Sequence, residues 1–170
     1  MGSGIALNFA LRHTEKVKAL VLIRPAWLAQ GSPENLKILL EAAKLIGQPD
    51  GKAIFEKKAD YQTIKQKLPL AARSILGVFG NNQRPEIPIV LEQIIKDQPF
   101  DQLADLTTID KPCLIIGNDD DPLHPIEMAT TIHQQIKGSQ FVKVPSRYVN
   151  NRQHKQMVQA TIKDFLSKIE

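Results

Sequence analysis

The fold is decided by residues 113–125, CLIIGNDDDPLHP, and by the elements that follow them. Residues 113–116 form a short apolar run between a proline and a glycine, a pattern that is typical of a buried strand. A helix is predicted from about 125 to 136, and a further short strand is predicted over 140–144. Strands that alternate with helices in this way indicate a parallel sheet joined by right-handed crossovers.

The same alternation extends toward both ends of the chain. Residues 4–13 place apolar side chains four positions apart, which predicts a helix, and residues 17–23, VKALVLI, predict another buried strand. A last helix with one apolar face is predicted over 154–169. The predicted fold class is therefore α/β, with about three parallel strands and flanking helices.

The middle of the chain has a different character. Residues 32–99 contain helical segments broken by Gly and Pro, and no convincing strand. Helices are expected over about 32–46, 50–60, 61–77 with a kink or break at Pro69, and 85–96. The predicted organisation is a core made of residues 1–31 and 100–170, with an all-helical insertion over 32–99.

Composition excludes several classes of protein. With 42% apolar and 24% charged residues in 170, the chain is too apolar to be disordered, and no apolar run approaches the roughly 18 residues of a membrane-spanning helix. The net charge of +4 comes from scattered cations without a basic stripe, so neither nucleic acid nor a membrane is an expected partner. Cys113 is the single cysteine and no leader pattern opens the chain, so we expect a cytoplasmic protein.

Two polar groups are candidates for chemistry. Asp119, Asp120 and Asp121 directly follow the strand at 113–116, where open parallel sheets place their binding and catalytic groups. His154 stands in a polar loop after the next strand. An Asp after one strand and a His after the next can meet at one edge of a sheet, where the carboxylate holds the imidazole in the tautomer of a general base.

Plainer interpretations of these residues stay open. The three carboxylates are equally well explained by a solvated acidic turn. A calcium loop is the weaker explanation, because three adjacent Asp residues lack the alternating spacing and the glycine of such a loop. His124 lies between two prolines and is expected to pack or cap, and His154 taken alone is a histidine near a helix N-terminus, where the helix dipole disfavours the protonated ring.

These residues together carry a family resemblance. The order of strand, DPLHP, helix, strand, loop, His and helix resembles the C-terminal third of the α/β-hydrolase fold, whose triad runs nucleophile, acid, histidine. The resemblance implies that Asp121 is the acid, with Asp119 and Asp120 less suited, and that His154 is the catalytic histidine. It also implies that residues 32–99 are the helical cap of that fold.

The first residues, MGSG, are similar to the second half of the nucleophile elbow of this family, Gly-x-Ser-x-Gly. Met1 would then follow the nucleophile and supply the backbone N–H of the oxyanion hole, and Gly2 would be the final glycine. The serine itself would stand immediately before Met1. The chain thus resembles a hydrolase that starts one residue too late, and we expect it to be inactive alone, or nearly so.

No other residue is expected to replace that serine. Ser3 is expected to be a helix N-cap and Cys113 to lie in the core, while Ser74 and Ser146 lack the context of an elbow. Trp27 follows the first strand, where the family builds its acyl pocket. Lining this substrate pocket and packing in the core are equally good interpretations of Trp27.

The function implied by the resemblance is hydrolysis of a small ester, lactone or amide by a serine hydrolase, without a cofactor or a metal ion. The alternative is a non-catalytic remnant of the fold that binds a ligand or associates with itself. The physical reason for this alternative is the edge of the first strand. This strand lacks the neighbour that pairs with it in the full fold, so some of its N–H and C=O groups are left unpaired. A homodimer through this sheet edge would satisfy those groups.

Overall fold

The computed structural model describes residues 1–81 and 85–169, and the chain forms two compact units. One unit combines Met1–Gly31 with Gln98–Glu170, and the other is Ser32–Asp97. The first unit contains the sheet, whereas the second is helical in its described part. That the helical unit acts as a cap stays a prediction.

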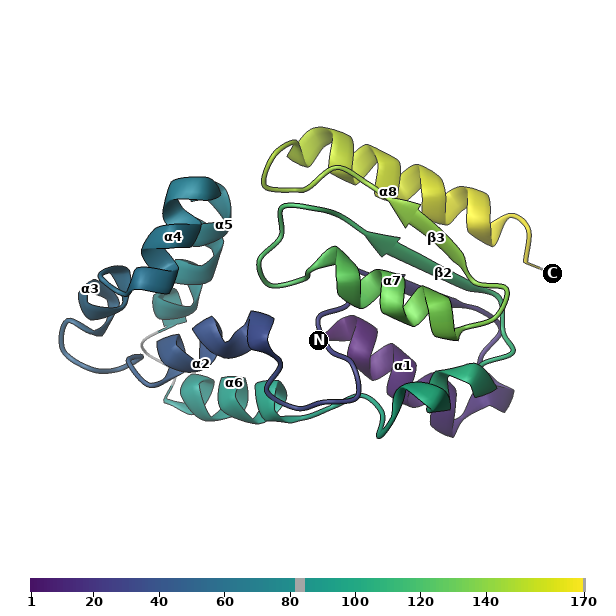
Figure 1. Ribbon diagram of the computed structural model, residues 1–170, viewed down its shortest axis with the longest axis horizontal. Coiled ribbons are helices and arrows are strands. Elements are labelled where there is room, and N and C mark those ends of the chain that lie inside the picture. Colours follow the sequence, from purple (N-terminus) through teal and green to yellow (C-terminus); the bar gives the residue numbers. More distant parts are fainter. Residues whose placement is uncertain (82–84, 170) are drawn as a thin grey trace. The chain divides into compact units, whose positions relative to one another are not determined.

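The sheet has three parallel strands in the order β1-β2-β3 (Figure 1). The strands are β1 (Leu20–Ile23), β2 (Cys113–Gly117) and β3 (Gln140–Lys143). All five residues of the central strand β2 are buried, as expected for a parallel strand covered on both faces. This arrangement confirms the predicted α/β class with three parallel strands.

The strand predicted over 17–23 begins only at Leu20. The N–H of Leu20 donates to the carbonyl oxygen of Pro112 over 2.8 Å, and this bond opens the ladder between β1 and β2. Pro112 has no N–H to donate to the carbonyl oxygen of Lys18, the residue before Ala19. The hydrogen-bonded ladder between β1 and β2 therefore stops at Leu20.

Helices cover both faces of the sheet (Figure 1). One face packs against α1 (Gly2–Arg12) and α7 (Ile126–Gln135), and the other against α8 (Asn151–Leu166). The core on the α1 and α7 face comprises buried residues that include Leu7, Leu22, Ile115 and Ile132. The core on the α8 face comprises Leu114, Ile116, Val144 and Phe165. Alternate side chains of β2 thus pack into the two cores on opposite faces of the sheet, as the two-residue period of a strand requires.

Two short 3-10 segments complete this unit, η1 (Thr14–Lys16) and η4 (Leu103–Thr108). The last helix starts earlier than predicted because Asn150 is its N-cap, and the Asn150 side chain accepts a hydrogen bond from the N–H of Gln153 over 3.0 Å.

The helical unit packs around aromatic side chains. The ring centroid of Phe55 lies 5.2 Å from that of Tyr61 and 5.3 Å from that of Phe79, and all three residues are buried. The described elements are η2 (Glu34–Leu36), α2 (Lys37–Ala43), α3 (Gly51–Glu56), α4 (Ala59–Lys67), α5 (Pro69–Leu76), η3 (Gly77–Asn81) and α6 (Glu86–Lys96).

Two predicted helices of this unit are divided in the structure. The helix expected over 32–46 is a 3-10 segment followed by α2, which ends at Ala43, and the chain then turns at Gly47 with a φ of +84°. The helix expected over 61–77 is broken at Pro69, as predicted, and Pro69 opens α5 at its first position, where the missing N–H is not needed.

Strand β1 has a strand neighbour on one side only, within the described residues. The N–H groups of Leu20 and Arg24 donate toward β2, so the backbone groups of Val21 and Ile23 point the other way. The hydroxyl of Ser3 donates to the carbonyl oxygen of Ile23 over 2.9 Å and satisfies one of them. Ser3 belongs to α1, and the N-cap Met1 of this helix and its residues Ile5 and Phe9 expose large apolar side chains four positions apart.

Within residues 1–81 and 85–169, none of the helices has both the length and the apolar character that crossing a membrane requires.

Candidate functional site

Asp121 lies in the turn that follows β2, at the carboxyl end of the sheet, and its side chain is fully buried. Its Oδ1 atom accepts hydrogen bonds from the backbone N–H of Leu123 over 3.2 Å and of His124 over 3.1 Å. A turn in which an Asp side chain accepts from N–H groups two and three residues later is a common local structure for this residue type. The carboxylate is therefore fixed by its own turn before any other element contacts it.

Arg24 supplies the other half of this site from the end of β1. Its Nε donates to Oδ2 of Asp121 over 2.8 Å, and its Nη2 donates to the same oxygen. Arg24 has a left-handed backbone with a φ of +51°, an uncommon conformation for a residue with a side chain. The ring of Tyr148, from the loop after β3, lies 5.8 Å from the guanidinium carbon of Arg24. Loops that follow all three strands thus converge here.

His124 is the third member of the cluster. Its Nδ1 lies 3.0 Å from Oδ1 of Asp121 and 3.1 Å from Nη2 of Arg24. Its side chain is 24% exposed, whereas that of Asp121 is 0% exposed. The sequence interpretation of His124 as a packing or capping residue left out this contact with the carboxylate.

Opposing effects determine the pKa of Asp121. Burial raises it, while the hydrogen bond and charge of His124 and the charge and hydrogen bonds of Arg24 lower it, and the outcome is a pKa below the ordinary value of 3.8. Asp121 is therefore a carboxylate at neutral pH.

His154 occupies the first turn of α8, after the loop that follows β3, and it is buried. Its Nδ1 lies 2.8 Å from the carbonyl oxygen of Pro145. A carbonyl oxygen only accepts, so Nδ1 carries a proton, and in a neutral ring Nε2 is then the acceptor. Among the described residues, no hydrogen bond joins His154 to Asp121, and their pairing stays a prediction.

The other two predicted site residues lie in the same unit. Met1 is the N-cap of α1, and its carbonyl oxygen accepts from the N–H of Gly4 over 2.9 Å. Partial burial of the α-amino group lowers its pKa from the ordinary value of 8.0. Trp27 follows β1 and is buried, and its Nε1 has no hydrogen-bond acceptor among the described residues. The proposed roles of Met1 in an oxyanion hole and of Trp27 in a substrate pocket stay predictions.

Several serine hydroxyls form hydrogen bonds with groups other than the side chains of Asp121 and His154. Ser3 donates to Ile23, as described above, and Ser146 donates to the carbonyl oxygen of Asp120 over 3.0 Å. The hydroxyl oxygen of Ser139 lies 2.8 Å from Nδ1 of His133, a pair that the sequence does not predict because the two residues belong to different elements. This pair lies before β3, at the amino end of the sheet, and not beside Asp121.

Two further features mark the carboxyl end of the sheet. Asp120, like Arg24, has a left-handed φ of +51°, so two residues with side chains adopt this costly conformation near Asp121. Asn118 is fully buried, and its Oδ1 has no hydrogen-bond donor among the described residues.

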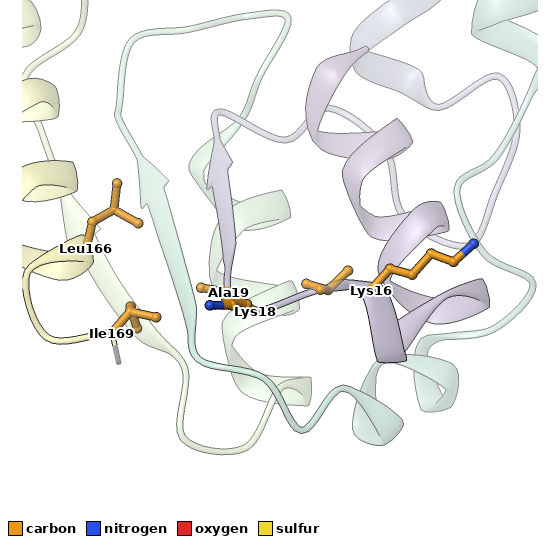
Figure 2. A pocket seen from close by; sticks show the side chains of 6 residues that line it. Lys16, Lys18, Ala19, Leu166 and Ile169 are labelled. Carbon is orange, nitrogen blue, oxygen red and sulfur yellow. The ribbon is translucent and has the colours of Figure 1, made fainter.

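A hollow of about 520 Å³ lies at the opposite, amino end of β1. It is lined by Lys16, Val17, Lys18, Ala19, Leu166 and Ile169. Figure 2 shows Leu166 and Ile169 on the side of α8, across from Ala19 and Lys18, while the Lys16 side chain extends away from them. Because Asp121 and His154 follow the carboxyl ends of β2 and β3, this hollow is not part of the candidate site.

No protein-family model and no curated protein matches the sequence. Solved structures do match. An acetylester hydrolase from Corynebacterium glutamicum is 12% identical with a TM-score of 0.72, covering 99% of this chain and 59% of its own. MGS-M2, an alpha/beta hydrolase enzyme from a deep-sea metagenome library, is 18% identical with a TM-score of 0.67, covering 99% and 63%. The enol-lactonase from Burkholderia xenovorans LB400 is 21% identical with a TM-score of 0.62, covering 97% and 62%.

The chain thus spans about 60% of the length of these structures. At such identities the likeness shows the fold, and it confirms the predicted partial fold.

Proposed function

We propose that this chain, whose fold is part of the α/β-hydrolase fold, carries the acid and the base of a serine-hydrolase site for small esters, lactones or amides. The observation that carries the proposal is the placement of Asp121 after β2 and of His154 after β3. The carboxyl ends of parallel strands form one edge of the sheet, where such folds bind ligands. Both side chains are buried, and Asp121 is ionised at neutral pH.

We expect the chain alone to support little or no turnover, because among the described residues no serine hydroxyl forms a hydrogen bond with His154. Activation of a serine requires a hydroxyl within hydrogen-bond distance of an imidazole, which a carboxylate in turn orients. Among the described residues, Ser139 is the serine whose hydroxyl lies close to an imidazole, that of His133, and it lies at the wrong end of the sheet. Met1 as an oxyanion donor and Trp27 as a wall of the acyl pocket belong to the same proposal.

The test is hydrolysis of 4-nitrophenyl acetate by the purified chain, compared with His154→Ala and with His13→Ala as the matched control. We expect all three proteins to hydrolyse the ester far more slowly than the roughly 1–1000 per second of typical enzymes. A turnover number of about 1 per second or more that His154→Ala abolishes and His13→Ala preserves would show a working nucleophile and contradict the expectation that the chain is inactive alone.

A second candidate function, self-association, is favoured by the open side of β1. The backbone groups of Val21 point away from β2, and α1, which contacts β1, exposes Ile5 and Phe9, next to the exposed side chain of its N-cap Met1. A bare strand edge beside exposed apolar side chains favours pairing with another chain. A homodimer that joins two β1 edges is therefore the alternative to a catalytic role.

Light scattering during size-exclusion chromatography distinguishes the two. Self-association predicts a dimer at micromolar concentration and a monomer for Ile5→Lys, with Ile89→Lys, an equally exposed residue of α6, as the control that stays dimeric. A wild-type monomer at these concentrations rules this alternative out.

The proposal includes a cytoplasmic setting and a small-molecule ligand. Cys113 is buried and free, which fits a compartment in which disulfides are not formed. The proposal includes neither nucleic acid nor a membrane as a partner.

A further inference from the structure

We propose that the hollow at the amino end of β1 binds the anion of a medium-chain fatty acid. The hollow has a volume of about 520 Å³, which lies within the roughly 300–1,000 Å³ of pockets that hold small molecules. Asp121 and His154 follow the carboxyl ends of β2 and β3, so this site is at the other end of the sheet. The proposal therefore goes beyond the proposed function and does not depend on it.

The hollow has apolar walls that come from two elements. Its apolar side chains are Val17 and Ala19 before β1, Leu166 at the end of α8 and Ile169 beyond it. Figure 2 shows Leu166 and Ile169 across from Ala19. Ala19 and Ile169 pack against the core on the α8 face, whereas Leu166 is 50% exposed. A hydrocarbon chain that lies between these walls removes apolar surface from water, both its own and that of the protein.

Positive charge borders the apolar walls. Lys16 and Lys18 line the hollow and are exposed, and neither forms an ion pair within residues 1–81 and 85–169. Among the described residues, no Asp or Glu lines the hollow. Lys18 lies beside Ala19, while the Lys16 side chain extends away from the apolar walls (Figure 2). An anionic head group thus pairs with Lys18 and is attracted by Lys16 from a greater distance.

The backbone of Ala19 offers a further donor to an anion. The N–H of Leu20 donates to Pro112 on the side of β2, and successive residues of an extended chain direct their N–H groups to opposite sides. The N–H of Ala19 therefore points to the open side of β1, and it has no acceptor among the described residues. A carboxylate has two acceptor oxygens, so it can accept from this N–H and from Lys18 together.

A second copy of the chain is a poorer occupant of the hollow. A two-fold interface brings the same surface of both copies together, so the two lysines of one copy would approach those of the other. Like charges that face each other across an interface are unfavourable, and the lining supplies no carboxylate to offset them. A fatty acid anion supplies the missing negative charge together with an apolar chain.

The experiment is two-dimensional nitrogen-15 NMR of the full chain, with sodium decanoate added below the concentration at which it forms micelles. We expect the amide signals of Ala19 and Ile169 to shift saturably. Butyrate has the same head group and a short tail, and it should bind at least about tenfold more weakly, because each fully buried methylene contributes about fourfold. Decyltrimethylammonium has a tail of the same length and the opposite charge, and it should also bind more weakly.

Lys18→Gln tests the head-group contact. This change should weaken decanoate binding about two- to fivefold, as expected for an exposed ion pair. The matched control is Lys137→Gln, which changes another exposed lysine at the amino end of the sheet, outside the hollow, and should leave binding unchanged. If Lys18→Gln fails to fold, the comparison of decanoate with decyltrimethylammonium on the wild type still decides.

Several results would overturn the proposal. They are the absence of a saturable shift with decanoate, equal binding of decyltrimethylammonium or butyrate, and equal effects of the two lysine changes. A dilution series without ligand tests the other occupant, because amide signals of Ala19 and Ile169 that move with protein concentration would show that a second copy covers the hollow. None of these readouts requires ester turnover, so their failure is separate from a failure of the proposed function.

Discussion

Arg24 and Asp121, which are 97 residues apart in the chain, form an ion pair that ties the end of β1 to the turn after β2. The Asp121 side chain is 0% exposed and that of Arg24 is 12% exposed. Little water therefore reaches either charge, and each charged group is stabilised by the opposite charge of its partner. Asp121, which we propose as the acid of the site, is thus also a structural link between two strands.

Loss of one partner of this pair should destabilise the fold strongly. Arg24→Met leaves the Asp121 charge buried without its counterion, and such a change typically costs about 3–5 kcal/mol. Urea unfolding followed by circular dichroism measures this free energy. The control is Asp119→Asn, which removes the exposed ion pair with Lys143 and should cost less than about 1 kcal/mol. Equal effects of the two changes would show that the buried pair does not stabilise the fold.

Acid should remove the contribution of Asp121. Its pKa in the folded chain lies below the ordinary value of 3.8, so the ionised form favours folding. This contribution is fully present above the unfolded pKa of about 3.9 and is lost as pH falls through the lower folded value. The gap in unfolding free energy between the wild type and Asp121→Asn should therefore be constant near neutral pH and narrow below about pH 4. A gap that widens in acid contradicts the lowered pKa.

Gly117, the last residue of β2, should not tolerate a methyl group. A Cβ at this position would lie 3.0 Å from Cβ of Ala129, 3.2 Å from Cε2 of Phe141 and 3.3 Å from Cγ1 of Ile126. Crowding of this kind costs about 1–3 kcal/mol, so Gly117→Ala should lower the unfolding midpoint in urea. Gly77→Ala is the control, because a Cβ there meets nothing within 4 Å. Similar midpoints for the two variants would show that α7 yields to accommodate the methyl group.

The thiol of Cys113 should be unreactive in the folded chain. The residue is 1% exposed, and burial raises the pKa of its thiol to about 12. Because the thiolate is the reactive form, Ellman's reagent at pH 8 should label Cys113 only as fast as the chain unfolds. The control is the same reaction in guanidinium, where one thiol per chain should react at once. Immediate labelling under native conditions would contradict the burial of β2.

The main elements of the sheet unit could be predicted because local patterns determine them. The apolar run at the start of β2 marks a buried strand, and the carboxylates that follow it lie at the carboxyl end of the sheet, as expected. Pro112, in contrast, shortens β1 through a hydrogen-bond register that involves a distant part of the chain. The pattern of residues within one strand does not show how that strand is aligned with its neighbour.

The sequence predicts only part of the candidate site. It indicates Asp121, but the ion pair of Asp121 with Arg24 depends on a left-handed backbone at Arg24 and on a contact between two separate strand ends. Neither leaves a signal in the sequence. The contact with His124 did leave one, because an Asp followed three residues later by a His in a proline-bounded turn is the spacing of a side-chain-capped turn.

The proposed function requires that the chain carry the acid and base of a hydrolase without a reactive serine. The most direct measurement is intact-protein mass spectrometry after treatment with a fluorophosphonate, in which a serine oxygen bonds to phosphorus and fluoride leaves. We expect no adduct on the folded chain. The hydroxyl of Ser3 donates a hydrogen bond to the carbonyl oxygen of Ile23, and that of Ser146 donates one to the carbonyl oxygen of Asp120. A single stoichiometric adduct on one serine, absent in His154→Ala, would contradict the claim.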